Sequence, residues 1–323
     1  MKKERLPSYG GQALIEGVLM RGSRAVAAAM RAPDGTITVQ TEELSGIYQS
    51  RIKSIPFLRG LVMLWDALGL GSRFLTISAN LQTGEEEKIE GPALYLTLVI
   101  SLVGAIALFV LLPTALGNWI EKGLKLGFWA ASLIEAVLRL VLAIGYIWVI
   151  GKMPDIQRVF AYHGAEHKTI NAYEAGAELT PVNVMKYSLE HPRCGTGFLL
   201  TVIVFSIVFF TPLRVLPVLA RLPLQVLLVP VIACLAYEYM RWTASHLDSS
   251  FIRALIKPNL ALQRLTTRQP TLEMLEVSIC SFNSMLALET SLLASPAVGI
   301  EDLLSNSASN IKSRSNGSSS EGV

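Results

Sequence analysis

The sequence predicts an α-helical integral membrane protein with about four transmembrane helices and a small β-containing cytoplasmic module at its N-terminus. Of 323 residues, 51% are apolar and only 16% are charged, whereas roughly 25% of a soluble protein is charged. A bilayer-spanning helix needs about 20 mostly apolar residues. Segments of this kind occupy residues 93–112, 126–151, 196–212 and 222–240.

Charge and cysteine content exclude other classes. The net charge of +3 is too small to predict nucleic-acid binding, and three cysteines cannot build a disulfide framework. Of the 28 Lys and Arg residues, 23 fall in residues 1–92, 152–195 and 241–323. Because Lys and Arg gather on the cytoplasmic side of membrane proteins, we expect an inner (plasma) membrane protein with both termini in the cytoplasm. The lipid bilayer is its expected partner.

The rest of the chain divides around the membrane domain. Residues 25–44 read as two extended runs about a turn at Pro33, Asp34 and Gly35. Four glycines within residues 9–22 indicate tight turns or the close approach of another group. The predicted segments are a β-containing module (1–50), an amphipathic interfacial helix with a charged linker (51–92), the four-span domain (93–240), a cytoplasmic helical segment (241–290) and a polar, disordered tail (291–323).

The most informative motif is His163-Gly-Ala-Glu166-His167, within a helix expected from Pro154 to Gly176. In a helix, the two histidines lie one turn apart on one face, with Glu166 beside them. Two imidazoles at this spacing can bind one divalent ion, most simply Zn²⁺, and the carboxylate can act as a base on metal-bound water. The order of residues matches the inverzincin motif. The alternative is a polar interfacial helix whose histidines are solvated or capped.

Further ligands are predicted around this motif. Glu174 lies on the same helical face as His163. A second helix, with Thr180 as its N-cap and its end before Pro192, would deliver His191 and Cys194 to the start of the third span. The third-ligand candidates are Glu174, His191, Cys194, Glu238 and His246. Within the second span, Glu135 and Arg139 are four residues apart and are expected to neutralise each other.

Four blocks of the sequence, at residues 9–22, 161–176, 191–200 and 262–279, resemble the YqhQ-like family. These are bacterial multi-pass membrane proteins grouped as domain of unknown function 1385. The family is described as predicted metal-dependent enzymes. The resemblance therefore implies a metal-related role for His163, Glu166 and His167, and draws attention to Glu174, His191 and Cys194.

The leading hypothesis is a metal-dependent hydrolase at the cytoplasmic membrane face, with Glu166 as its base. The rival is a non-catalytic membrane scaffold, or a docking protein for a membrane or cytoplasmic partner, with a structural metal site. His163, His167, His191 and Cys194 could form the closed four-ligand set of such a site. A transporter would need polar residues along several spans or broken helices, and Pro230 is the only hint of one.

Overall fold

The computed structural model describes residues 9–83 and 91–294. The predicted charged linker at 84–90 and most of the predicted tail, 295–323, lie outside the described residues. The elements are β1 (Gly10–Leu14), β2 (Gly17–Arg21), β3 (Ala25–Arg31), β4 (Ile37–Glu43), η1 (Gly46–Gln49), η2 (Arg51–Ser54), α1 (Leu58–Trp65), η3 (Asp66–Leu70), α2 (Gly71–Thr83), α3 (Gly91–Ile106), η4 (Ala107–Leu111), α4 (Leu112–Leu124), α5 (Phe128–Ile150), α6 (Pro154–Glu174), α7 (Pro181–Val184), α8 (Gly195–Phe210), η5 (Pro212–Val215), α9 (Val218–Ala244), α10 (Ser250–Leu255), α11 (Lys257–Thr266) and α12 (Leu272–Ala294).

The N-terminal module is a four-stranded antiparallel sheet in the order β1-β2-β3-β4. The predicted turn joins β3 and β4, with Gly35 at φ +89°. The Asp34 carboxylate holds the turn by accepting hydrogen bonds from the amide and hydroxyl of Thr36, at 2.9 and 2.7 Å. The glycine spacing at residues 9–22 does not predict strands, yet this segment forms the β1–β2 hairpin.

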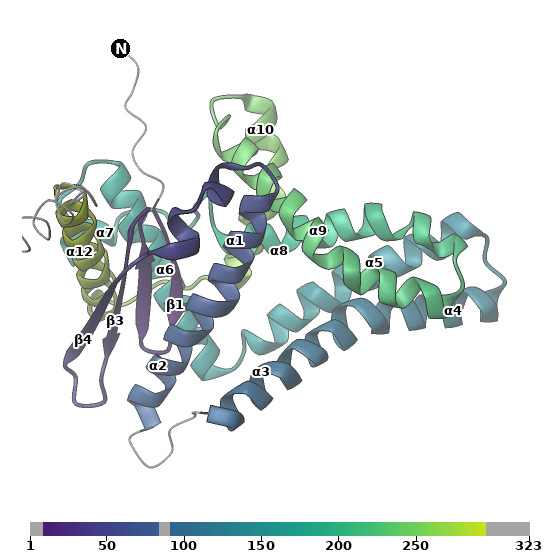
Figure 1. The fold of residues 1–323 in the computed structure, drawn as a ribbon, viewed down its shortest axis with the longest axis horizontal. Helices are drawn as coiled ribbons and strands as arrows, with labels where there is room; N and C mark the ends of the chain where they lie inside the picture. Colours follow the sequence, from purple (N-terminus) through teal and green to yellow (C-terminus); the bar gives the residue numbers. More distant parts are fainter. Residues whose placement is uncertain (1–8, 84–90, 295–323) are drawn as a thin grey trace, which may run out of the picture.

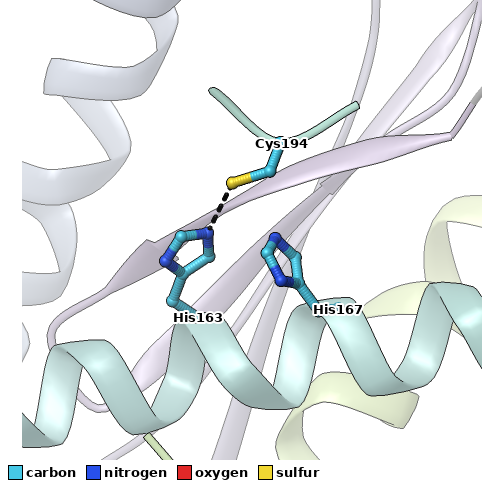
Figure 2. Close-up of side chains that lie close together, drawn as sticks. All are labelled: His163, His167 and Cys194. Carbon is cyan, nitrogen blue, oxygen red and sulfur yellow. Dashed lines mark hydrogen bonds between the residues drawn. The ribbon is translucent and has the colours of Figure 1, made fainter. Parts of the chain in front are cut away.

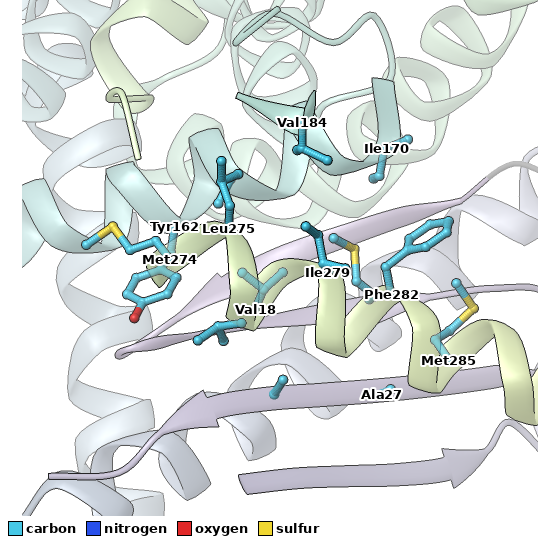
Figure 3. Close-up of a cluster of buried hydrophobic side chains, with 14 of the residues drawn as sticks. Val18, Ala27, Tyr162, Ile170, Val184, Met274, Leu275, Ile279, Phe282 and Met285 are labelled. Atoms are coloured by element: carbon cyan, nitrogen blue, oxygen red, sulfur yellow. The ribbon is translucent and has the colours of Figure 1, made fainter. Parts of the chain in front are cut away.

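Side chains of the central strands β2 and β3 alternate between the two faces of the sheet, and both sets are buried. Val18, Met20 and three alanines of β3 face one side, which is covered by α6 and α12 (Figure 3). Leu19, Val26 and Met30 face the other side and pack with Phe74 of α2. The alanines of β3 leave room for α12 to lie close to the strand.

A continuous helix, Leu58–Thr83, connects the sheet to the rest of the molecule. Its second half lies on the sheet, where the Ser78 hydroxyl accepts a hydrogen bond from the Ile15 amide at 3.2 Å. Its first half packs on α9. There, a Cβ at Gly60 would lie 2.8 Å from the Cα of Cys234, so only glycine allows the two helices to approach so closely.

Four helical segments form what we call the membrane arm: the continuous helix Gly91–Leu124, together with α5, α8 and α9. They extend away from the sheet to one side of the molecule (Figure 1). In the described part of the chain, six helices are long and apolar enough to cross a membrane. The chain is thus a mostly helical, multi-pass membrane protein with a small N-terminal sheet. The two candidates beyond the four predicted ones are Leu58–Thr83 and Leu272–Ala294.

Candidate metal centre

Helix α6 carries the His-x-x-Glu-His motif, as the sequence predicts. Pro154 lies in its first turn, and Gly176, just past its end, has φ +73°. His163 and His167 lie one turn apart, with 4.4 Å between their ring centroids. A Cβ at Gly164 would overlap the carbonyl oxygen of Arg268, so α6 is seated directly on the segment that follows α11.

The predicted helix from Thr180 to Pro192 is wrong beyond its first turn. Thr180 does cap α7 by accepting a hydrogen bond from the Asn183 amide at 3.4 Å, but α7 ends at Val184. The carbonyls that would continue a helix instead face α6. Lys168 Nζ donates to the carbonyls of Met185 (2.8 Å) and Tyr187 (2.6 Å). The chain from 185 to 191 is therefore a loop shaped by side chains of α6.

Backbone carbonyls orient both histidines of the motif. His163 Nδ1 lies 2.9 Å from the carbonyl oxygen of Thr266, and His167 Nδ1 lies 2.5 Å from that of Leu189. A carbonyl only accepts, so each Nδ1 carries the proton and each Nε2 presents a lone pair. Metal-binding histidines are commonly held in this way. His167 Nε2 is buried and has no hydrogen-bond partner among the described residues.

Cys194 completes the group that we call the His/Cys cluster: His163, His167 and Cys194 (Figure 2). Its Sγ lies 3.2 Å from His163 Nε2. Cys194 is the N-cap of α8, and the amide and hydroxyl of Thr196 lie 3.4 and 3.1 Å from its sulfur. These contacts hold the sulfur at the start of α8.

The geometry of the His/Cys cluster fits a tetrahedral metal ion. One ligand atom from each residue lies within 4.8 Å of the other two. Zn–N and Zn–S bonds of about 2.0–2.3 Å place ligands roughly 3.3–3.6 Å apart, so shifts of about 1 Å would close the set around an ion. The chemistry also fits, because the cluster offers two imidazole lone pairs and one thiol.

His191 and Glu174 lie beside the His/Cys cluster and are not part of it. The His191 ring centroid is 5.7 Å from that of His167, and its Nε2 is buried without a hydrogen-bond partner among the described residues. The distance from His191 Nε2 to the nearest carboxylate oxygen of Glu174 is 3.9 Å, which is too long for a hydrogen bond. Burial lowers the pKa of His191, which keeps the ring neutral. Glu174 forms an ion pair with Arg193.

The two distant candidates have other partners. Glu238 accepts hydrogen bonds from Arg59 Nε at 2.6 Å and from the Phe57 amide at 3.0 Å, joining α1 to α9. His246 lies just past the end of α9, and its Nδ1 is 2.8 Å from the carbonyl oxygen of Trp242 in that helix. Neither belongs to the group of ligand atoms around His163 and His167.

Glu166 is buried next to the cluster, on the side of the sheet. Burial raises its pKa to about 7, while the neighbouring His163 and the Gly11 amide, which donates a hydrogen bond to it, act in the opposite direction. A Cβ at Gly11 would lie 3.0 Å from the Cδ of Glu166. The close approach that the N-terminal glycines predict is therefore realised at Gly11, and its partner is the candidate base.

Sequence reasoning missed two residues that support the site. Lys168 follows the motif and anchors the 185–191 loop, and burial lowers its pKa. Gln263 binds the backbone of His191 from both sides: its amide donates to the His191 carbonyl at 2.9 Å and its oxygen accepts from the His191 amide at 3.0 Å. Gln263 lies in one of the four blocks shared with the YqhQ-like family, which was the available signal.

The fold and the site define a multi-pass membrane protein with a group of His and Cys side chains that could hold a metal ion beside a small sheet. The chain belongs to the family described as "Protein of unknown function (DUF1385)", whose model matches residues 55–288. It is 35% identical over 305 residues to "Uncharacterized protein YqhQ" of Bacillus subtilis (strain 168), an alignment covering 90% of this chain and 96% of that protein. No solved structure matches. The family predicted from the four blocks is thus confirmed.

Proposed function

We propose that this chain is a metal-dependent membrane enzyme of hydrolase type, with His163, His167 and Cys194 as ligands of a divalent ion, most simply Zn²⁺. One observation carries the proposal. The Nδ1 atoms of both histidines point to backbone carbonyls, which leaves two Nε2 lone pairs directed at the same space as the Cys194 sulfur. A set of three protein ligands is typical of catalytic zinc, because the fourth position stays open for water or substrate.

Glu166 is the proposed base. A zinc ion held by His163, His167 and Cys194 would supply Lewis acidity and lower the pKa of a bound water. With a pKa of about 7, the Glu166 carboxyl can take up and release a proton near neutral pH. Its carboxylate is held by the Gly11 amide, so the β1 segment controls where this group points.

A second function is favoured by His191. Its unpartnered Nε2 and its position next to His167 allow a closed set of three histidines and one cysteine. Closed four-ligand sets are typical of structural zinc. In that case the protein is a membrane scaffold, and the metal fastens the loop before α8 to α6.

For the membrane topology, we propose four spans formed by the membrane arm, in the bacterial inner membrane with cytoplasmic termini. The support is an aromatic residue at each end of α5: Trp129 and Trp148 are 76% and 54% exposed. At 1.5 Å per residue they are about 28 Å apart, close to the ~30 Å of a hydrocarbon core. The helices Leu58–Thr83 and Leu272–Ala294 both pack on the sheet, which favours an interfacial position for them.

The substrate of the proposed enzyme is expected to come from the bilayer. An apolar groove of about 470 Å³ runs along α5 past Ile144 and Trp148 to Leu265. Leu265 precedes Thr266, whose carbonyl orients His163. An amphiphile whose chain lies in this groove would bring its polar part toward the His/Cys cluster.

The test combines metal analysis with complementation. Purified wild-type protein should contain about one zinc per chain, and a His163→Ala/His167→Ala double variant should lose it. His246→Ala removes a histidine outside the cluster and should keep the metal. If the protein is an enzyme, Glu166→Gln should retain zinc and fail to complement a deletion strain, since loss of a general base costs ~10²–10⁴ in rate.

The outcomes separate the two functions. Full complementation by Glu166→Gln with metal retained would refute the enzyme hypothesis and support the scaffold hypothesis. If the double histidine variant contains as much zinc as the wild type, the proposed metal site is refuted, and both proposed functions are refuted with it.

A further inference from the structure

The far end of the membrane arm, away from the sheet, contains a buried polar cluster. The carboxylate of Glu135 accepts hydrogen bonds from Arg139 at 2.7 Å and Thr114 at 2.9 Å, and it pairs with Arg214. Arg214 also pairs with Glu121. The expected pair of Glu135 and Arg139 therefore forms, but as part of a larger network that includes Arg214 of η5.

Arg221 of α9 adds a charge that this network does not neutralise. The residue is 2% exposed, and its Nε and Nη2 are buried without a hydrogen-bond partner in the described part of the chain. Gln225 follows one turn later on the same helical face. Its oxygen lies 3.2 Å from the Thr114 hydroxyl, while its buried Nε2 also has no partner among the residues described. Leaving a charge buried and unpaired costs several kcal/mol.

The charges of the cluster do not balance. It contains three guanidinium groups, on Arg139, Arg214 and Arg221, and two carboxylates, on Glu121 and Glu135. The unpartnered atoms of Arg221 and Gln225 are all N–H donors. Arg214 Nε is a further buried donor without a partner among the described residues. A region with one excess positive charge and four unused donor atoms is suited to an anion.

The two free positions of Arg221 indicate the shape of that anion. Nε and one Nη form the side edge of a guanidinium, a fork that matches two oxygens of a phosphate or carboxylate. The Gln225 amide adds a third donor one turn away. A single-point ion such as chloride would use this geometry poorly.

The position in the membrane indicates a lipid phosphate. Arg221 lies at the start of α9, at the end of the arm where Trp119 and Trp129 are 75% and 76% exposed. Exposed tryptophans mark the headgroup level of a bilayer. The cavity beside Glu135 and Arg139 has a volume of only about 10 Å³, room for about one water. Arg221 and Gln225 do not line this cavity, so a phosphate has to approach them from the end of the arm, where the Glu121 side chain is 33% exposed.

We propose that the far end of the membrane arm binds the phosphate group of an anionic phospholipid, with Arg221 and Gln225 as its donors. The site is independent of the His/Cys cluster. The Arg139, Glu135 and Arg214 network holds the helices around it.

The test measures thermal unfolding and lipid binding of the full chain in detergent. Added phosphatidylglycerol should raise the unfolding midpoint of the wild type, and phosphatidylcholine should not. Arg221→Met should weaken phosphatidylglycerol binding about 10- to 100-fold, the factor expected for one charge-assisted pair of hydrogen bonds. The control, Lys122→Gln, removes an exposed positive charge at the same end of the arm and should bind normally.

A folding control is built into the same variant. Because it removes a buried unpaired charge, Arg221→Met should be at least as stable as the wild type without lipid. Inorganic phosphate is added in a third set of measurements. If it raises the unfolding midpoint as much as phosphatidylglycerol does, and Arg221→Met abolishes that rise, the site binds phosphate and the lipid is not its source. An equal gain from phosphatidylcholine, or an equal gain in Arg221→Met and wild type, would overturn the proposal.

Discussion

Gly164→Ala tests whether α6 must touch the backbone after α11 for the cluster to form. The new methyl would overlap the Arg268 carbonyl oxygen and lie 2.7 Å from Leu189 Cδ2. Overpacking of this kind costs ~1–3 kcal/mol, and a clash with backbone belongs at the upper end. Alanine regains up to ~1 kcal/mol of helix propensity. We therefore expect a net loss of about 2 kcal/mol in the free energy of unfolding.

The displaced segment includes Thr266, whose carbonyl orients His163 at 2.9 Å. Loss of such an outer hydrogen bond typically weakens metal binding by ~10–100-fold. Zinc affinity of purified Gly164→Ala should fall by this factor, together with its thermal midpoint. The matched control is Gly145→Ala, where no atom lies within 4 Å of the new methyl. If Gly164→Ala keeps the stability and zinc affinity of the wild type, the close packing of α6 on Arg268 and the role of the Thr266 carbonyl in orienting His163 are both refuted.

Three further outcomes are expected. Lys168→Met removes the donor to two loop carbonyls, so limited proteolysis should cut the chain near residues 185–191. Lys186→Met, an exposed control, should resist the protease. Equal resistance of both variants would contradict the anchoring by Lys168. Cys194→Ser should lose zinc, measured by elemental analysis, whereas Cys280→Ser should keep it; a zinc-replete Cys194→Ser would exclude the thiol as a ligand. Glu289→Ala removes the carboxylate that accepts from the amides of residues 23–25 and should cost about 3 kcal/mol in thermal unfolding; an unchanged midpoint would show that these amides find other acceptors.

Local signals were enough for the β3–β4 hairpin and for α6. A Pro-Asp-Gly turn fixes the first, and Pro154 and Gly176 set the limits of the second. The β1–β2 hairpin escaped prediction because β2 is buried on both faces, so its apolar residues show no alternation. The 185–191 loop escaped because side chains of α6 compete for its carbonyls, and sequence periodicity does not contain that information.

The same limit applies to the candidate sites. The spacing of His163 and His167 follows from helical geometry alone. Thr266 and Leu189, whose carbonyls orient those rings, come from segments whose position depends on the tertiary fold. Arg221 reads as an ordinary charge near the end of a span, and only the packing of α9 against the arm shows that it is buried without a partner.

The chemistry of the unpartnered atoms connects the two sites. Apart from the Arg21–Asp66 and Arg193–Glu174 ion pairs, the buried side-chain atoms that have no hydrogen-bond partner among the described residues lie in two groups. Near the sheet they are imidazole nitrogens, and the one on His167 presents a lone pair, which suits a cation. At the far end of the arm they are N–H donors of arginine and glutamine, which suit an anion. Since buried polar groups are rarely left unsatisfied, each group predicts a ligand of opposite character.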